Sequence, residues 1–242
     1  MRYRLATLGL APILLAQGRH VRRVTPRLPE PAGARSGAQG SGPTLRLLIL
    51  GDSAAAGVGV SNQAEALSGR LVSELGSTFR VCWKLHAQTG YAVQDLVNDL
   101  LSAASERFDV ALVSVGVNDV TGRTSAGDWR ARLARMIELL QARYGVQFIL
   151  LTSLPPMHLF PALPQPLRWY LGARAKQLDR LLGSVATGHS QCERLRLALP
   201  LSGPAIAADG FHPGAAAYAA WAHQAAAAIR TRLRRGDWPF EH

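Results

Sequence analysis

The chain has 242 residues, of which 48% are hydrophobic and 18% are charged, and its formal net charge is +11. This length and composition suit one α/β domain with a substantial core. The basic residues are neither interleaved with aromatic residues nor carried by a known nucleic-acid-binding module, so we expect no nucleic-acid partner. Cys82 and Cys192 form no Cys-x-x-Cys pair, which gives metal binding no support. Two free buried thiols are expected, with a disulfide as the alternative.

Residues 1–24 combine positive charge with a short apolar stretch. Arg2 and Arg4 precede apolar residues 5–16, as in an export signal. However, Arg19, Arg22 and Arg23 follow directly, no Ala-x-Ala cleavage site is apparent, and the stretch is shorter than the roughly 20 residues that span a bilayer. The alternative is a retained helix that packs on the domain or lies on a membrane surface. We expect the retained form and a cytoplasmic protein, with an exported one as the alternative.

Positive charge is concentrated near the N-terminus. The first 40 residues contain seven arginines against the single acidic residue Glu30, a net charge of +6. Each basic group near an anionic lipid surface contributes about 1 kcal/mol to binding. Peripheral membrane contact through this Arg-rich segment is therefore one hypothesis.

Residues 25–43 are rich in Pro, Gly, Ser and Ala, which predicts a connector ahead of the core domain. The chain thus divides into an apolar and basic segment (1–24), a connector (25–43) and a core domain (44–242). Within the core domain, apolar patterns predict strands at 45–50, 80–85, 110–115, 147–152 and 195–199. Helices are predicted at 63–75, 92–106, 128–143, 167–186 and 215–234. This alternation predicts a three-layer α/β/α sandwich around a five-stranded parallel sheet, with right-handed crossovers.

The first predicted strand ends at a serine. Apolar residues 45–50 stop at the tripeptide Gly-Asp-Ser (51–53), and small residues follow it. A buried strand with this sequence places Ser53 at its carboxyl end, where ligands bind in open α/β sheets. The alternative is an ordinary turn, in which Asp and Ser bond to their own backbone.

Two later segments favour a catalytic interpretation of Ser53. The apolar run 108–115 leads to Asn118, whose side-chain amide can donate two hydrogen bonds. Near the C-terminus, Asp209 precedes His212 by three residues, so both side chains can turn toward one site. A serine hydroxyl becomes a strong nucleophile when a base removes its proton and a carboxylate orients that base. Ser53, His212 and Asp209 can supply these three roles.

Taken together, these motifs resemble the SGNH hydrolase superfamily, also called GDSL-type esterases and lipases. The four family blocks correspond to Gly-Asp-Ser (51–53), Gly90, Gly-Val-Asn-Asp (116–119) and Asp-Gly-Phe-His-Pro (209–213). The resemblance extends over residues 44–230. The three alanines at 54–56 depart from the family's fuller first block. The resemblance therefore does not define the pocket wall beside the nucleophile.

This resemblance implies the strand order 2-1-3-4-5 and specific roles for the site residues. Ser53 would be the nucleophile, His212 the general base and then acid, and Asp209 its orienting partner. The backbone N–H groups of Ser53 and Gly90, with the Asn118 side chain, would form the oxyanion hole. No metal and no organic cofactor is expected.

The loop at 153–164 is apolar where a surface loop is normally polar. Met157, Phe160 and Leu163 are therefore candidates for substrate contact, stiffened by neighbouring prolines. The alternative is that all three cap the core.

The sequence favours a serine esterase that acts on a small-molecule ester through an acyl-enzyme. The acyl group could be a lipid chain, an acetyl group on a sugar or a thioester. An acyltransferase with the same three residues and a catalytically silent, membrane-docked binding domain are the alternatives. The sequence leaves the oligomeric state undecided.

Overall fold

The computed structural model describes residues 2–122, 124–198 and 205–234. The elements in chain order are α1 (Arg2–Val24), β1 (Ser36–Gln39), β2 (Thr44–Gly51), α2 (Ser53–Ala56), α3 (Leu67–Leu75), β3 (Arg80–Ala87), α4 (Val93–Ser102), β4 (Val110–Ser114), α5 (Val117–Thr121), α6 (Ala126–Ala142), β5 (Phe148–Thr152), the 3₁₀ helix η1 (Met157–Leu159), α7 (Leu167–Thr187), β6 (Cys192–Leu195) and α8 (Ala215–Arg234).

The sheet has the order β1-β3-β2-β4-β5-β6. The five strands from β2 to β6 are parallel and follow the expected order 2-1-3-4-5, which confirms the predicted α/β architecture. The expected count of five strands was incomplete, because β1 adds a sixth strand, antiparallel to β3. The sequence of β1, Ser-Gly-Ala-Gln, lacks the branched and aromatic residues typical of strands, so its pattern predicted a connector. Its backbone nevertheless pairs with the outer edge of β3.

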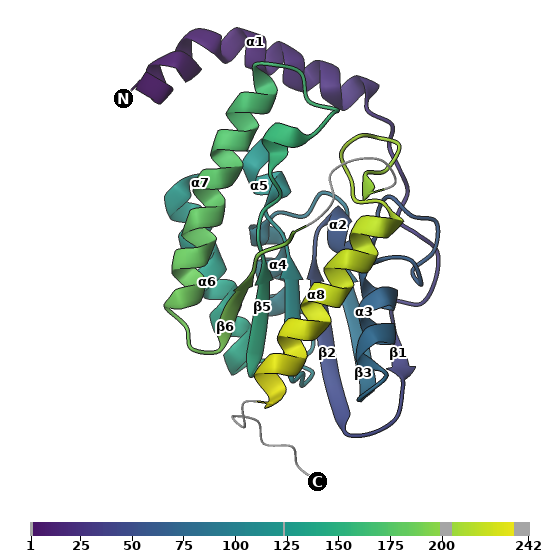
Figure 1. Ribbon diagram of the computed structural model, residues 1–242. Coiled ribbons are helices and arrows are strands. Elements are labelled where there is room, and N and C mark those ends of the chain that lie inside the picture. Colours follow the sequence, from purple (N-terminus) through teal and green to yellow (C-terminus); the bar gives the residue numbers. More distant parts are fainter. Residues whose placement is uncertain (1, 123, 199–204, 235–242) are drawn as a thin grey trace.

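Helices cover both faces of the sheet (Figure 1). Alternate side chains of β2 point to opposite faces, as the pleat of a strand requires. Leu48 and Leu50 join the cluster formed with α4, α6 and α7, whereas Leu45, Leu47 and Ile49 join the cluster formed with α3 and α8. Burial of each such side chain stabilises the fold by roughly 1.5–3 kcal/mol. β2, the strand that leads to Ser53, is therefore held rigidly from both sides.

Some predicted boundaries shift, each for a local reason. The helix predicted at 63–75 begins at Leu67, because the buried Gln63 side chain instead bonds to the Ala56 carbonyl and the Ser68 hydroxyl. The last strand is Cys192–Leu195 rather than 195–199, and Leu199 lies outside the described residues. Prolines at 155 and 156 follow β5 and have no N–H with which to extend the ladder.

Helix α1 lies across the end of the molecule at which the parallel strands finish (Figure 1). Gln17 fastens it to the start of α7, donating to the Gln165 carbonyl at 2.6 Å and accepting from the Leu167 N–H at 3.0 Å. Leu14 is buried, whereas Ile13 and Leu15 are about half exposed. None of the described helices is long and apolar enough to cross a membrane. The division into segments 1–24, 25–43 and 44–242 stays a prediction.

Candidate active site

The turn after β2 presents Ser53 at the carboxyl edge of the sheet. Only glycine fits at position 51, because a Cβ there would come within 2.0 Å of the Ser114 carbonyl oxygen. The Asp52 N–H donates to that same carbonyl at 3.0 Å, and the Asp52 carboxylate accepts from the Ala54 N–H at 3.0 Å. Asp52 therefore caps α2, and the chain turns sharply at Ser53.

Ser53, His212 and Asp209 form one hydrogen-bonded row. His212 Nε2 lies 2.9 Å from Ser53 Oγ, and His212 Nδ1 lies 2.5 Å from Asp209 Oδ2. The other carboxylate oxygen of Asp209 accepts from the backbone N–H groups of Phe211 and His212, each at 3.0 Å. When Nδ1 carries the ring proton, Nε2 is free to accept the serine proton. The turn at 209–212 thus orients both the carboxylate and the imidazole.

The three carboxyl groups around this row differ electrostatically. Burial acts to raise the pKa of Asp209, but hydrogen bonds from His212 and Phe211 outweigh burial and lower it. Burial raises the pKa of Asp52 to about 7, opposed by the Ala54 N–H. Burial also raises the pKa of Asp119, opposed by hydrogen bonds from Val93 and Thr124. Of the three, Asp209, which faces the imidazole, is therefore the carboxyl group whose ionised form the site stabilises.

Gly90 and Asn118 follow the two strands that flank β2. In the sheet register, Gly51 pairs with Ala87 of β3 and with Ser114 of β4, so the residues that follow all three strands meet at one edge. Asn118 Nδ2 donates to the Tyr91 carbonyl at 2.9 Å, which ties the two flanking loops together and leaves its second N–H available.

Two backbone donors beside the serine are also available. The N–H groups of Ser53 and Gly90 form no hydrogen bond with any residue in the described ranges. Gly90 has a φ of +94°, a conformation that other residues rarely adopt. These donors and the free N–H of Asn118 are of the kind that stabilise an oxyanion.

A cavity of about 130 Å³ adjoins Ser53 and His212. The ends of β4 and β5, the residues after β5, residues 205–206 and the first turns of α8 form its wall. Phe160 contributes to that wall and makes an edge-to-face contact with Phe211, with ring centroids 5.0 Å apart. Met157, Phe160 and Leu163 all pack in the core cluster of α4, α6 and α7. Of these three candidates in the loop at 153–164, Phe160 alone also lines the cavity.

His86, His158 and the two cysteines are not part of this row. His86 Nε2 pairs with Asp99 at 2.8 Å, and His158 is exposed on η1. Cys82 and Cys192 are free. Both were expected to be buried, but they are only half-buried. Across the ranges that the structure describes, no group of three or more His, Cys, Asp or Glu side chains could hold a metal ion.

Three residues that the sequence reasoning passed over belong to the surroundings of the site. Thr152 and Trp221 line the cavity, and Glu30 binds the residue before Gly90. Thr152 could have been found, because it ends a buried strand at the same sheet edge as Ser53. Trp221 lies in the alanine-rich helix α8, and Glu30 is 59 residues from its partner, so neither gives a local signal.

The fold and the reactive row are those of an ester-cleaving hydrolase of the SGNH superfamily. Residues 49–220 match the GDSL-like Lipase/Acylhydrolase family, and the chain belongs to this family. The expected resemblance is thereby confirmed, as is the expectation of an enzyme that acts on ester bonds.

Individual relatives agree with this assignment. The chain is 29% identical over 255 residues to a GDSL-like esterase of Mycobacterium tuberculosis, covering 94% of this chain and 79% of that protein. In fold it is similar to a lipolytic G-D-S-L family protein of Veillonella parvula (TM-score 0.62, 16% identity, 78% of this chain and 100% of that one). It is also similar to a lipase/acylhydrolase of Enterococcus faecalis (TM-score 0.60, 18% identity, 78% and 96%).

Proposed function

We propose that the protein is a serine esterase that cleaves small carboxylic esters through an acyl-enzyme on Ser53. The observation that carries this proposal is the hydrogen-bonded row Ser53–His212–Asp209, with contacts of 2.9 and 2.5 Å. Such a row activates a hydroxyl that is otherwise a weak nucleophile. It also holds the imidazole in one tautomer.

The proposed reaction proceeds in two halves. Ser53 Oγ attacks the ester carbonyl while its proton passes to His212 Nε2, and Asp209 stabilises the imidazolium. The N–H groups of Ser53 and Gly90 and the Asn118 amide receive the negative charge on the carbonyl oxygen. His212 then gives the proton to the departing alcohol. Water repeats the sequence on the acyl-enzyme and releases the acid.

The cavity supports a short acyl group. Its volume of about 130 Å³ is well below the roughly 300–1,000 Å³ of pockets for drug-sized ligands. The test is the hydrolysis of p-nitrophenyl acetate, butyrate and octanoate, for which we expect kcat/KM to fall sharply at octanoate. A profile that rises toward octanoate would contradict the short-acyl assignment. Added alcohol that diverts the acyl group from acid to a new ester would indicate a transferase instead.

Phe160 is proposed to limit acyl length, and Leu163 offers a matched control from the same loop. Both side chains are nearly buried, but only Phe160 lies at the cavity. We expect Phe160→Ala to shift the preferred acyl group toward longer chains. Both substitutions should lower the melting temperature, because both side chains pack in the core, but Leu163→Ala should keep the profile. An unchanged profile in Phe160→Ala would favour a purely core-capping role.

We also propose that α1 docks the enzyme on anionic membranes. Ile13 and Leu15 are 49% and 55% exposed, and the nearby Arg19, Arg22 and Arg23 are exposed on the same helix. Exposed apolar side chains beside basic ones are typical of helices that lie in a lipid interface.

Vesicle sedimentation tests this docking. We expect the full chain to sediment with vesicles containing phosphatidylglycerol, less so with phosphatidylcholine alone, and the double variant Ile13→Ser/Leu15→Ser to remain in the supernatant. Deletion of residues 1–40 would be a poorer test, because it also removes Glu30 and β1. Equal sedimentation of the wild type and the double variant would count against the proposal.

A further inference from the structure

Two residues that line the cavity beside Ser53 each have a polar side-chain atom without a hydrogen-bond partner among the described residues. Thr152 Oγ1 and Trp221 Nε1 are both buried, and neither bonds to any residue in the described part of the chain. The two residues are only 4% and 3% exposed, and both line the cavity. They come from different elements, since Thr152 ends β5 and Trp221 lies on α8.

Packing alone does not account for these two polar groups. Phe148 and Leu150, which precede Thr152 on the same face of β5, belong to the apolar cluster that packs against α8. Valine has nearly the shape of threonine and would fill position 152 without burying a hydroxyl. Burial of a polar group without a partner is unfavourable, and such groups in native proteins usually have a specific reason. Both residues line one small cavity, so a ligand bound there can supply the partner.

The chemistry of the two groups defines that partner. An indole N–H can only donate, whereas a threonine hydroxyl can donate and accept. The bound group must therefore contain a hydrogen-bond acceptor, which in an acyl group is most simply an oxygen. Among the described residues of the wall there is no Lys or Arg, and the wall includes Asp52, so a carboxylate would lack a counter-charge. A neutral oxygen, in a hydroxyl or a ketone, matches the site.

We propose that Trp221 and Thr152 form a specificity site for a short acyl group that carries a hydroxyl or keto oxygen. This inference rests on the proposed esterase function and names its substrate class. The acyl group, rather than the alcohol, is assigned to the cavity because it stays bonded to Ser53 throughout the reaction. The alcohol has to leave and water has to reach the same serine. The part of the site that binds the alcohol must therefore be open to solvent.

The test compares p-nitrophenyl esters that differ only in that oxygen. The pairs are butyrate with 3-hydroxybutyrate and pentanoate with 4-oxopentanoate, each rate being divided by the hydroxide-catalysed rate of the same ester. For at least one pair, we expect the wild type to favour the oxygen-bearing ester about tenfold or more in kcat/KM, the gain typical of one or two hydrogen bonds. In Trp221→Phe and Thr152→Val, this ratio should fall toward one.

Control variants separate this role from a structural one. Trp83→Phe, on β3 and outside the cavity wall, should keep the wild-type ratio. Thr152→Val should melt at the wild-type temperature or above it, because it removes an unpaired buried hydroxyl. A lower melting temperature with an unchanged ratio would make Thr152 a structural residue and overturn its assignment.

Three further outcomes distinguish failure of the specificity site from failure of the esterase proposal. Hydrolysis of all the esters with a ratio near one overturns the specificity site and leaves the esterase proposal standing. A preference that follows a hydroxyl placed on the alcohol, tested with butyrate esters of ethanol and ethylene glycol, overturns the assignment to the acyl group. If no ester is hydrolysed and Ser53 does not react with a fluorophosphonate, both proposals fail.

Discussion

Glu30 Oε1 accepts two hydrogen bonds from Thr89, one from its backbone N–H at 2.7 Å and one from its hydroxyl at 2.8 Å. Its other carboxylate oxygen pairs with Arg35 at 2.8 Å. Burial acts to raise the pKa of Glu30, but the contacts with Thr89 and Arg35 outweigh it and lower the pKa. The segment between α1 and β1 is thus fastened to the loop that carries Gly90.

Glu30 should act as a positioning residue for the oxyanion donor at Gly90. We expect Glu30→Ala to lower kcat for p-nitrophenyl acetate about tenfold with a smaller change in KM, because hydrogen bonds to a charged group contribute about 1.5–3 kcal/mol. Glu30→Gln keeps an acceptor oxygen and should recover part of the loss. The matched control is Glu138→Ala on α6, which removes an exposed ion pair with Arg135 and should leave kcat unchanged. Wild-type kcat in Glu30→Ala would contradict the positioning role.

Asn118 should contribute directly to stabilisation of the oxyanion. Removal of one such donor typically costs about 3–4 kcal/mol of transition-state stabilisation, so Asn118→Ala should lower kcat by about two to three powers of ten. The lost bond to the Tyr91 carbonyl should cost only about 1 kcal/mol of folding stability. Steady-state kinetics and urea unfolding measure the two effects separately. Asn98→Ala, on the exposed face of α4, is the control, and an Asn118→Ala enzyme of wild-type rate would exclude the role.

Asp209→Asn should preserve the turn but disturb the imidazole. The asparagine oxygen can still accept from the N–H groups of Phe211 and His212, whereas its amide would face His212 Nδ1 and favour the wrong tautomer. By analogy with other serine hydrolases, kcat should fall by about four powers of ten. Circular dichroism should show an unchanged fold. A loss of less than tenfold would mean that Asp209 does not orient the base.

Asp52 should make stability depend on pH. Its pKa is raised to about 7 in the folded protein, against about 3.9 in an unfolded chain. Between these values the folded state holds a proton that the unfolded state has released, so Asp52 makes the fold less stable as pH rises from about 4 to 7.

Asp52→Asn cannot ionise and keeps the oxygen that accepts from Ala54. Its melting temperature relative to the wild type should therefore increase between pH 4.5 and pH 8. Each pKa unit corresponds to about 1.4 kcal/mol, which makes the total gain a few kcal/mol. Calorimetry at several pH values measures it, and a difference that stays constant with pH would contradict the buried, protonated carboxyl.

The parallel sheet and the reactive row were predictable because their signals are local. The apolar run before Ser53 has the length and composition of a buried strand, and Asp209 and His212 are three residues apart. Alternation of strands and helices then places the strand ends at one edge. The strand order and the oxyanion-hole role proposed for Gly90 required the family resemblance.

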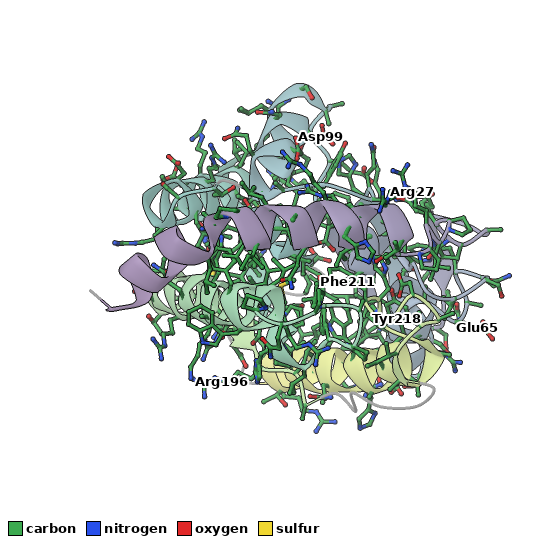
Figure 2. The ribbon with its side chains drawn as sticks, turned by 90° about the horizontal axis from the view of Figure 1, so that it is seen from above. Arg27, Glu65, Asp99, Arg196, Phe211 and Tyr218 are labelled. Atoms are coloured by element: carbon green, nitrogen blue, oxygen red, sulfur yellow. The ribbon has the colours of Figure 1, made fainter. Side chains whose placement is uncertain are left out.

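Other features were not predictable because they depend on contacts between distant residues. β1 has no strand-like residues and exists because its backbone pairs with β3. Glu30 and Trp221 reach the site only after the chain folds. In the apolar loop after β5, all three candidates pack in one core cluster, and composition could not show that Phe160 also lines the cavity while Met157 and Leu163 do not. Figure 2, viewed from the end of the molecule at which α1 lies, shows Phe211, which shortly precedes α8 in the chain, between α1 and α8 in projection.

The most direct test of a nucleophilic Ser53 is the intact mass of the wild type and of Ser53→Ala after reaction with a fluorophosphonate. We expect a single covalent adduct on the wild type and none on Ser53→Ala, because only a hydroxyl activated by His212 reacts readily with this reagent. An unlabelled wild type, or equal labelling of both proteins, would contradict a nucleophilic role for Ser53.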